Sequence, residues 1–223
     1  MGVRYLCGMK PTVVFDLDKV LLGGDATTLF LHGLLRQRPA RVLPLLLAAP
    51  VLLPAAAAPD VRPLAARALT RIAVGGRRED DVTAVAAAFG EALSRKPEAA
   101  VGDAIACLRR HRADGDDVVV ATGCEETLAR GFLTAVGLGD IDVVGSTGSL
   151  RPLRVRRAMG ETKLHLLIER GYPPPWSAVY SDSPSDLPLF AGTPRPVLVN
   201  AGERAARAVT RVLGRPPETR DWR

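Results

Sequence analysis

The sequence of 223 residues contains little of what several common protein classes depend on. Aromatic residues make up 4% of the chain and no basic-aromatic repeat occurs, which leaves little to stack nucleic-acid bases. The three histidines lie far in sequence from one another and from the cysteines, so no zinc-binding spacing is present. We therefore expect no nucleic-acid partner and no zinc site.

Cysteine is also scarce. Cys7, Cys107 and Cys124 form no CxxC pair and follow no signal peptide, which predicts reduced thiols and a cytoplasmic protein. One uncharged stretch, 42–58, is marginal in length for a membrane-spanning helix, which needs about 20 residues, and prolines interrupt it. We expect short buried or partly interfacial helices there, and no membrane span.

Lysine is scarce as well: only four of the 30 lysine and arginine residues are lysines. The net charge of +6 makes anionic partners or substrates plausible, but the arginines are scattered along the chain. We interpret the charge mainly as a solvated basic surface.

Hydrophobic residues, in contrast, make up 47% of the chain, which is enough for a buried core. A short apolar run at 12–15 is typical of a buried parallel strand. From about residue 25 to residue 96 the pattern is helical, with no convincing strand. Beyond it, helix patterns at 98–112 and 125–136 alternate with strand patterns at 117–123, 141–144, 177–180 and 196–199. This order predicts an α/β fold with a Rossmann-like parallel sheet, into which an all-helical block is inserted.

Four polar clusters follow the predicted strands or lie in loops beside them, where open α/β sheets bind ligands. They are DLD at 16–18, TG at 122–123, Lys163, and DSPSD at 182–186. Asp16 and Asp18 point to the same side of an extended segment, so they can hold a cation together with a third acid such as Asp182. Carboxylates without sulfur or imidazole suit Mg²⁺.

The order of these clusters resembles the haloacid dehalogenase-like (HAD) superfamily over the whole chain. Its first motif, DxDx[TV], matches DLDKV at 16–20, and its second, a Ser or Thr after a strand, matches Thr122. Its third, a lysine, matches Lys163 in GETK, and its acidic fourth matches SDSPSD at 181–186. The TG form of the second motif and the helical insert after the first resemble the branch that contains phosphoserine phosphatase.

This resemblance implies an α/β catalytic core made of residues 1–22 and 97–223, with a helical cap domain at 23–96. It also implies Mg²⁺-dependent hydrolysis of a small phosphorylated metabolite through an aspartyl-phosphate on Asp16. Asp18 would protonate the leaving alcohol and activate the attacking water, as general acid and base. The second acid also argues against a dehalogenase.

The resemblance assigns further residues to the site. Thr122, Gly123 and Lys163 would bind the phosphoryl oxygens. Asp25, where phosphoserine phosphatases carry a glutamate, would face the substrate. The expected metal set is Asp16, Asp18, Asp182 and Asp186, in which Asp186 orients a metal-bound water or Lys163.

Other interpretations of these residues stay open. An alcohol instead of water can accept the phosphate from Asp16, which would make the protein a phosphotransferase, and a HAD fold can also serve as a catalytically idle binding protein. Lys163 can be a lysine on a helix surface, and Thr122 an ordinary strand-end residue. The chain has no serine nucleophile elbow and no Walker loop, which excludes the obvious rival hydrolases.

Overall fold

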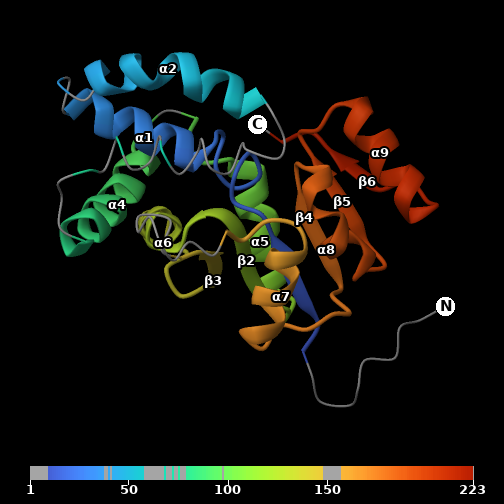
Figure 1. The fold of residues 1–223 in the computed structure, drawn as a ribbon. Coiled ribbons are helices and arrows are strands. Elements are labelled where there is room, and N and C mark those ends of the chain that lie inside the picture. Colours follow the sequence, from blue (N-terminus) through green and yellow to red (C-terminus); the bar gives the residue numbers. More distant parts are fainter. Residues whose placement is uncertain are drawn as a thin grey trace.

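The computed structural model in Figure 1 describes residues 10–37, 40, 42–57, 68, 72, 75, 79–96, 98–147 and 157–222. Its centre is a six-stranded sheet in the order β3-β2-β1-β4-β5-β6, in which every neighbouring pair is parallel. The strands are β1 (Thr12–Phe15), β2 (Asp117–Glu125), β3 (Asp142–Ser146), β4 (Ala178–Ser181), β5 (Pro196–Val199) and β6 (Glu218–Arg220). The predicted α/β class with a Rossmann-like parallel sheet is confirmed.

Helices cover both faces of this sheet because its strands are apolar on both sides. Side chains alternate along β1, so Val13 and Phe15 enter one core and Val14 enters the other. The first core includes side chains of α5 (Gly102–Ala113) and α6 (Glu126–Ala135). The second includes side chains of α7 (Glu161–Glu169), α8 (Leu187–Ala191) and α9 (Glu203–Leu213), and a short 3-10 helix, η2 (Pro184–Asp186), precedes α8.

Between β1 and α5 the chain forms the helices α1 (Ala26–Gln37), α2 (Val42–Ala57) and α4 (Glu79–Ser94), which lie at the upper left of Figure 1. The described residues of 25–96 contain no strand, as predicted. The segments that enter and leave this block run side by side. The amide of Gly23 donates to the carbonyl of Ala99 at 2.8 Å, and that of Val101 donates to Leu21 at 3.0 Å.

Two local predictions were wrong, and two elements were not predicted. Helix α5 begins at Gly102 instead of residue 98, because residues 99–101 pair with the segment that enters the helical block. The prolines at 50 and 54 lie inside α2, which is one continuous helix, and none of its described side chains is buried. Helix α9 and strand β6 lie beyond the last predicted element. None of the described helices is long and apolar enough to cross a membrane.

Candidate active site

The strand register brings three of the predicted clusters to one edge of the sheet. Phe15 on β1 pairs with Val120 on β2 and with Tyr180 on β4. The next residues in the chain, Asp16, Ala121 and Ser181, therefore lie side by side at this edge of the sheet. This is also where the strand order reverses, between β1 and β4, which is the usual ligand site of an open α/β sheet.

Asp16 is buried directly after β1 and lies beside a buried lysine. The Lys163 Nζ atom is 3.4 Å from Asp16 Oδ2 and 2.8 Å from Asp186 Oδ2, and the lysine is 3% exposed. Although Lys163 lies on a helix, α7, it is buried, so the alternative of a lysine on a helix surface is excluded. The amide of Leu17 donates to Asp16 Oδ1 at 2.8 Å, which fixes the orientation of the carboxylate.

The electrostatics of this pair favour a charged lysine. Burial alone would lower the pKa of Lys163, but the carboxylates of Asp16 and Asp186 outweigh it and raise that pKa. Burial raises the pKa of Asp16 well above its ordinary value against the opposing effect of Lys163, and Asp186, Asp18 and Asp182 raise it further. The site thus concentrates negative charge around a single buried ammonium.

Asp18 lies at the base of the helical block. Its Oδ1 atom accepts a 2.7 Å hydrogen bond from the amide of Ala26, the first residue of α1. Burial raises the pKa of Asp18 to about 6, although this hydrogen bond lowers it. Asp25 is exposed, and its Oδ1 accepts the amide of Thr28 at 2.6 Å, as an N-cap residue of α1 does.

Thr122 and Gly123 lie in the last part of β2, where its pairing with β3 is irregular, next to the end of β1. Thr122 is fully buried, and its Oγ1 accepts the amide of Cys124 at 3.1 Å. The carbonyl of Gly123 accepts the hydroxyl of Ser146 on β3 at 2.7 Å. These bonds hold this irregular part of β2 in place.

The two acids that follow β4, Asp182 and Asp186, contact different lysines. Asp182 Oδ2 is 3.4 Å from the Nζ atom of Lys19, whereas Asp186 contacts Lys163 and accepts the Ser181 hydroxyl at 2.7 Å. Burial raises the pKa of Asp182, and Lys19 opposes this rise. The remaining oxygen of Asp186, Oδ1, is buried and has no hydrogen-bond partner among the described residues.

The acids of the site lie close enough together to raise the question of a divalent cation. Among the described residues, no group of three or more acidic, histidine or cysteine side chains is close enough to hold a metal without other ligands. Mg²⁺, however, is commonly bound through one or two carboxylates, with waters and substrate phosphate as its other ligands. The site brings four carboxylates together with only two lysines, and all the donor atoms of its acids are oxygens. An oxygen-only donor set with this charge fits Mg²⁺.

Two residues in contact with the site were not predicted from the sequence. Ser181 binds Asp186, and Lys19 reaches Asp182 from a left-handed backbone conformation with φ of 57°. Ser181 stands inside the motif that was singled out, SDSPSD, and so could have been found there. Lys19 stands in DLDKV, and Asp182 stands in SDSPSD, so the placement of these two motifs at neighbouring strand ends could have indicated their contact.

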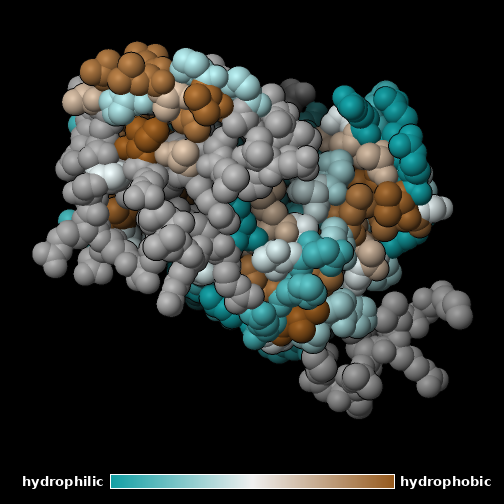
Figure 2. All heavy atoms as spheres, in the orientation of Figure 1, coloured by the Kyte–Doolittle hydropathy of each residue, from teal (hydrophilic) through white to brown (hydrophobic). Residues whose placement is uncertain are grey.

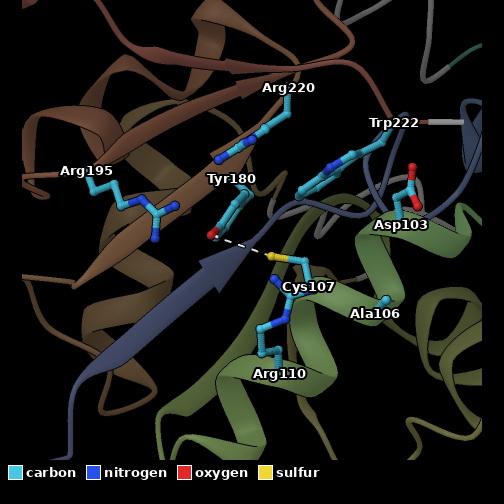
Figure 3. A pocket seen from close by; sticks show the side chains of 8 residues that line it. All are labelled: Asp103, Ala106, Cys107, Arg110, Tyr180, Arg195, Arg220 and Trp222. Atoms are coloured by element: carbon cyan, nitrogen blue, oxygen red, sulfur yellow. Dashed lines mark hydrogen bonds between the residues drawn. The ribbon is translucent and has the colours of Figure 1, made fainter.

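Figure 3 shows a separate cavity of about 240 Å³ whose lining includes none of the predicted site residues. Cys107 on α5 donates to the Tyr180 hydroxyl at 3.6 Å, and His111 bonds the same hydroxyl at 2.9 Å and Asp116 at 2.7 Å. The Tyr180 ring stacks on Phe15 at a centroid distance of 4.3 Å, and its carbonyl accepts the Asp16 amide at 2.8 Å. This cluster supports the strand end that carries Asp16.

The fold and this site define a Rossmann-like α/β enzyme in which an acid-lysine pair lies at the switch point of the sheet. The model of the haloacid dehalogenase-like hydrolase family matches residues 13–191, and the chain therefore belongs to this family of hydrolases. A comparison with curated protein sequences finds no match.

Several solved structures share the fold. A protein of unknown function from Bordetella pertussis Tohama I has 21% identity and a TM-score of 0.72, over 96% of this chain and 99% of that one. A phosphoserine phosphohydrolase-like protein from Francisella tularensis has 14% identity and a TM-score of 0.54, over 95% and 94%. Phosphoserine phosphatase in its apo form has 10% identity and a TM-score of 0.55, over 96% and 94%. At these identities the likeness establishes the shared fold.

Proposed function

We propose that this hydrolase is a Mg²⁺-dependent phosphomonoesterase that acts through an aspartyl-phosphate on Asp16. The observation that carries the proposal is the buried Asp16 carboxylate beside the Lys163 ammonium at 3.4 Å. A carboxylate at such a position can attack a phosphoryl group, while the lysine neutralises charge that develops on the phosphoryl oxygens. Thr122 and Gly123 would bind the same oxygens.

Asp18 would serve as general acid and base. A carboxyl with a pKa of about 6 is partly protonated near neutral pH, so it can donate a proton to the leaving alcohol. Once ionised, it can take a proton from the water that hydrolyses the acyl phosphate. The hydrogen bond from Ala26 to Asp18 Oδ1 would keep the carboxyl oriented at the junction with α1.

Asp16, the backbone carbonyl of Asp18 and Asp182 would hold the Mg²⁺ ion. Bound Mg²⁺ would supply Lewis-acid stabilisation of the phosphoryl oxygens. Asp186 would position Lys163 through their 2.8 Å contact. In this arrangement residues 23–96 form a cap over a core made of 1–22 and 97–223.

The test is turnover of an aryl phosphate with Mg²⁺, compared with turnover after chelation and after replacement by Ca²⁺. We expect activity with Mg²⁺ only. Asp16→Asn should lose turnover, while Asp140→Asn, which changes an exposed acid outside the site, should keep it.

Borohydride reduction of quenched enzyme should convert an acyl phosphate at residue 16 to homoserine, which mass spectrometry detects. If Asp16→Asn turned over substrate at the wild-type rate, the proposal would be contradicted. If alcohols added to the assay became phosphorylated, the protein would be a phosphotransferase.

The preferred substrate is proposed to be a small phosphorylated alcohol other than phosphoserine. Asp25 has a shorter side chain than the glutamate of phosphoserine phosphatases, and one of its oxygens already accepts the Thr28 amide at 2.6 Å. This arrangement is poorly suited to meet a substrate ammonium group. A screen of phosphorylated metabolites tests the prediction, and a tenfold lead for phosphoserine in kcat/KM would contradict it.

A further inference from the structure

Helix α2 combines features that are rare together in a folded protein. Its 16 residues, VLPLLLAAPVLLPAAA, include no charged or other polar side chain. None of its described side chains is buried. A helix that is apolar all round is normally covered by protein or lipid. Prolines inside α2 weaken it further, so it needs a covering surface for stability.

The exposed side chains form one stripe. Leu43, Leu46, Leu47 and Val51 are 62%, 62%, 75% and 71% exposed and follow one another at helical spacing. Pro50 and Pro54 are exposed at positions that continue the same stripe. The apolar patch is visible over α2 at the upper left of Figure 2. Contiguous exposed apolar surface of this kind marks an interaction site.

The charge around this helix indicates the kind of surface that it meets. Residues 36–78 contain eight arginines and one acid, Asp60, so this segment of 43 residues has a net charge of +7. The whole chain has a net charge of +6, which means that the rest of the protein is slightly acidic. The arginines are scattered along the chain, but acids balance them elsewhere, so the net positive charge is concentrated on both sides of the apolar helix in sequence.

We propose that α2 docks the protein on an anionic lipid bilayer, with the stripe Leu43, Leu46, Leu47 and Val51 in the interface. Apolar side chains together with flanking arginines bind such surfaces, since burial of the stripe and attraction to anionic headgroups act in the same direction. Pairing with a second copy is disfavoured, because it would bring two segments of charge +7 together. With 16 residues, α2 lies along the surface.

The proposal is tested by flotation of the full chain with vesicles of phosphatidylcholine and phosphatidylglycerol mixed three to one. We expect binding to these vesicles, weak binding to pure phosphatidylcholine, and release by high salt. Leu46→Ser/Leu47→Ser should weaken binding by at least about tenfold, because both side chains lose their apolar burial. Val212→Ser, which changes an equally exposed valine on α9, should bind like the wild type.

Circular dichroism of each variant shows that a loss of binding does not come from unfolding. Equal binding to both kinds of vesicle, or undiminished binding by the double serine variant, would overturn the proposal. A dimer that the double variant abolishes, together with no vesicle binding, would show that a second copy covers α2 instead. Flotation needs no turnover, so its result is separate from that of the proposed phosphatase activity.

Discussion

Asp18→Asn should stabilise the metal-free protein at neutral pH, although we expect it to impair catalysis. Burial raises the pKa of Asp18 from 3.8 to about 6, so ionising it costs more in the folded than in the unfolded protein. A difference of about two pH units corresponds to about 3 kcal/mol, which is the most that removal of this charge can add to the free energy of unfolding. Asparagine keeps the oxygen that accepts the Ala26 amide, so the local structure has no reason to change.

The size of this effect depends on pH. Between pH 3.8 and about 6 the folded protein binds more protons at Asp18 than the unfolded chain, so this residue makes stability fall as pH rises. The difference between variant and wild type should therefore grow from near zero below pH 4 to its full value at pH 7. It corresponds to a rise of roughly 6–12 °C in Tm at pH 7 for a chain of this size.

The measurement is thermal unfolding of both proteins in EDTA from pH 4 to 7.5. Asp140→Asn serves as the control, because Arg112 lowers the pKa of this exposed acid and its removal should give no stabilisation. A variant that is no more stable than the wild type at pH 7, or a difference that does not shrink toward pH 4, would refute the argument.

Three further predictions concern other buried or partly buried residues. Lys163→Met leaves the carboxylates around it without their buried cation, so we expect a loss of about 3–5 kcal/mol in the free energy of unfolding, measured in urea. Gly131→Ala puts a Cβ atom 2.3 Å from a backbone oxygen of α4 and should cost about 1–3 kcal/mol, whereas Gly102→Ala meets no atom within 4 Å and should cost far less. In peptide-resolved alkylation, Cys107 should react well before Cys124. Burial opposes ionisation of the half-buried Cys107 thiol, but His111 and Tyr180 outweigh it and lower its pKa, whereas burial raises the pKa of the Cys124 thiol. Equal rates of alkylation would contradict this.

The parallel sheet was predictable because its strands carry strong local signals. The runs at 12–15 and 196–199 coincide with β1 and β5, and the other predicted strands lie within two residues of the observed ones at either end. Part of the candidate site follows from the same signals, since three of the polar clusters lie at or near strand ends. Lys163 lies on α7, and its place beside Asp16, 147 residues away in the chain, was expected from the resemblance of the four motifs to the HAD superfamily.

Features that depend on contacts between distant segments could not be predicted. The start of α5 is set by pairing of residues 99–101 with the segment around Leu22, which no helical periodicity reveals. The prolines at 50 and 54 were expected to interrupt the segment, but both lie inside α2, which continues past them without the hydrogen bonds that their missing amides cannot make. Helix α9, in contrast, has a local signature in the pair Glu203–Arg207 and in Gly214, its left-handed C-cap.

The two ion pairs of the site differ in a way that separates the proposed roles of its acids. Lys163 and Asp186 are both buried, so breaking their contact would leave a charge in a poorly solvated place. Lys19 is 60% exposed, and an ion pair with such a partner contributes about 0–1 kcal/mol. Asp182 can therefore exchange its lysine for a metal ion at little cost, whereas Asp186 keeps Lys163 on Oδ2 and has only Oδ1 without a partner. We infer that Asp182 serves as the metal ligand and that Asp186 holds Lys163 beside Asp16.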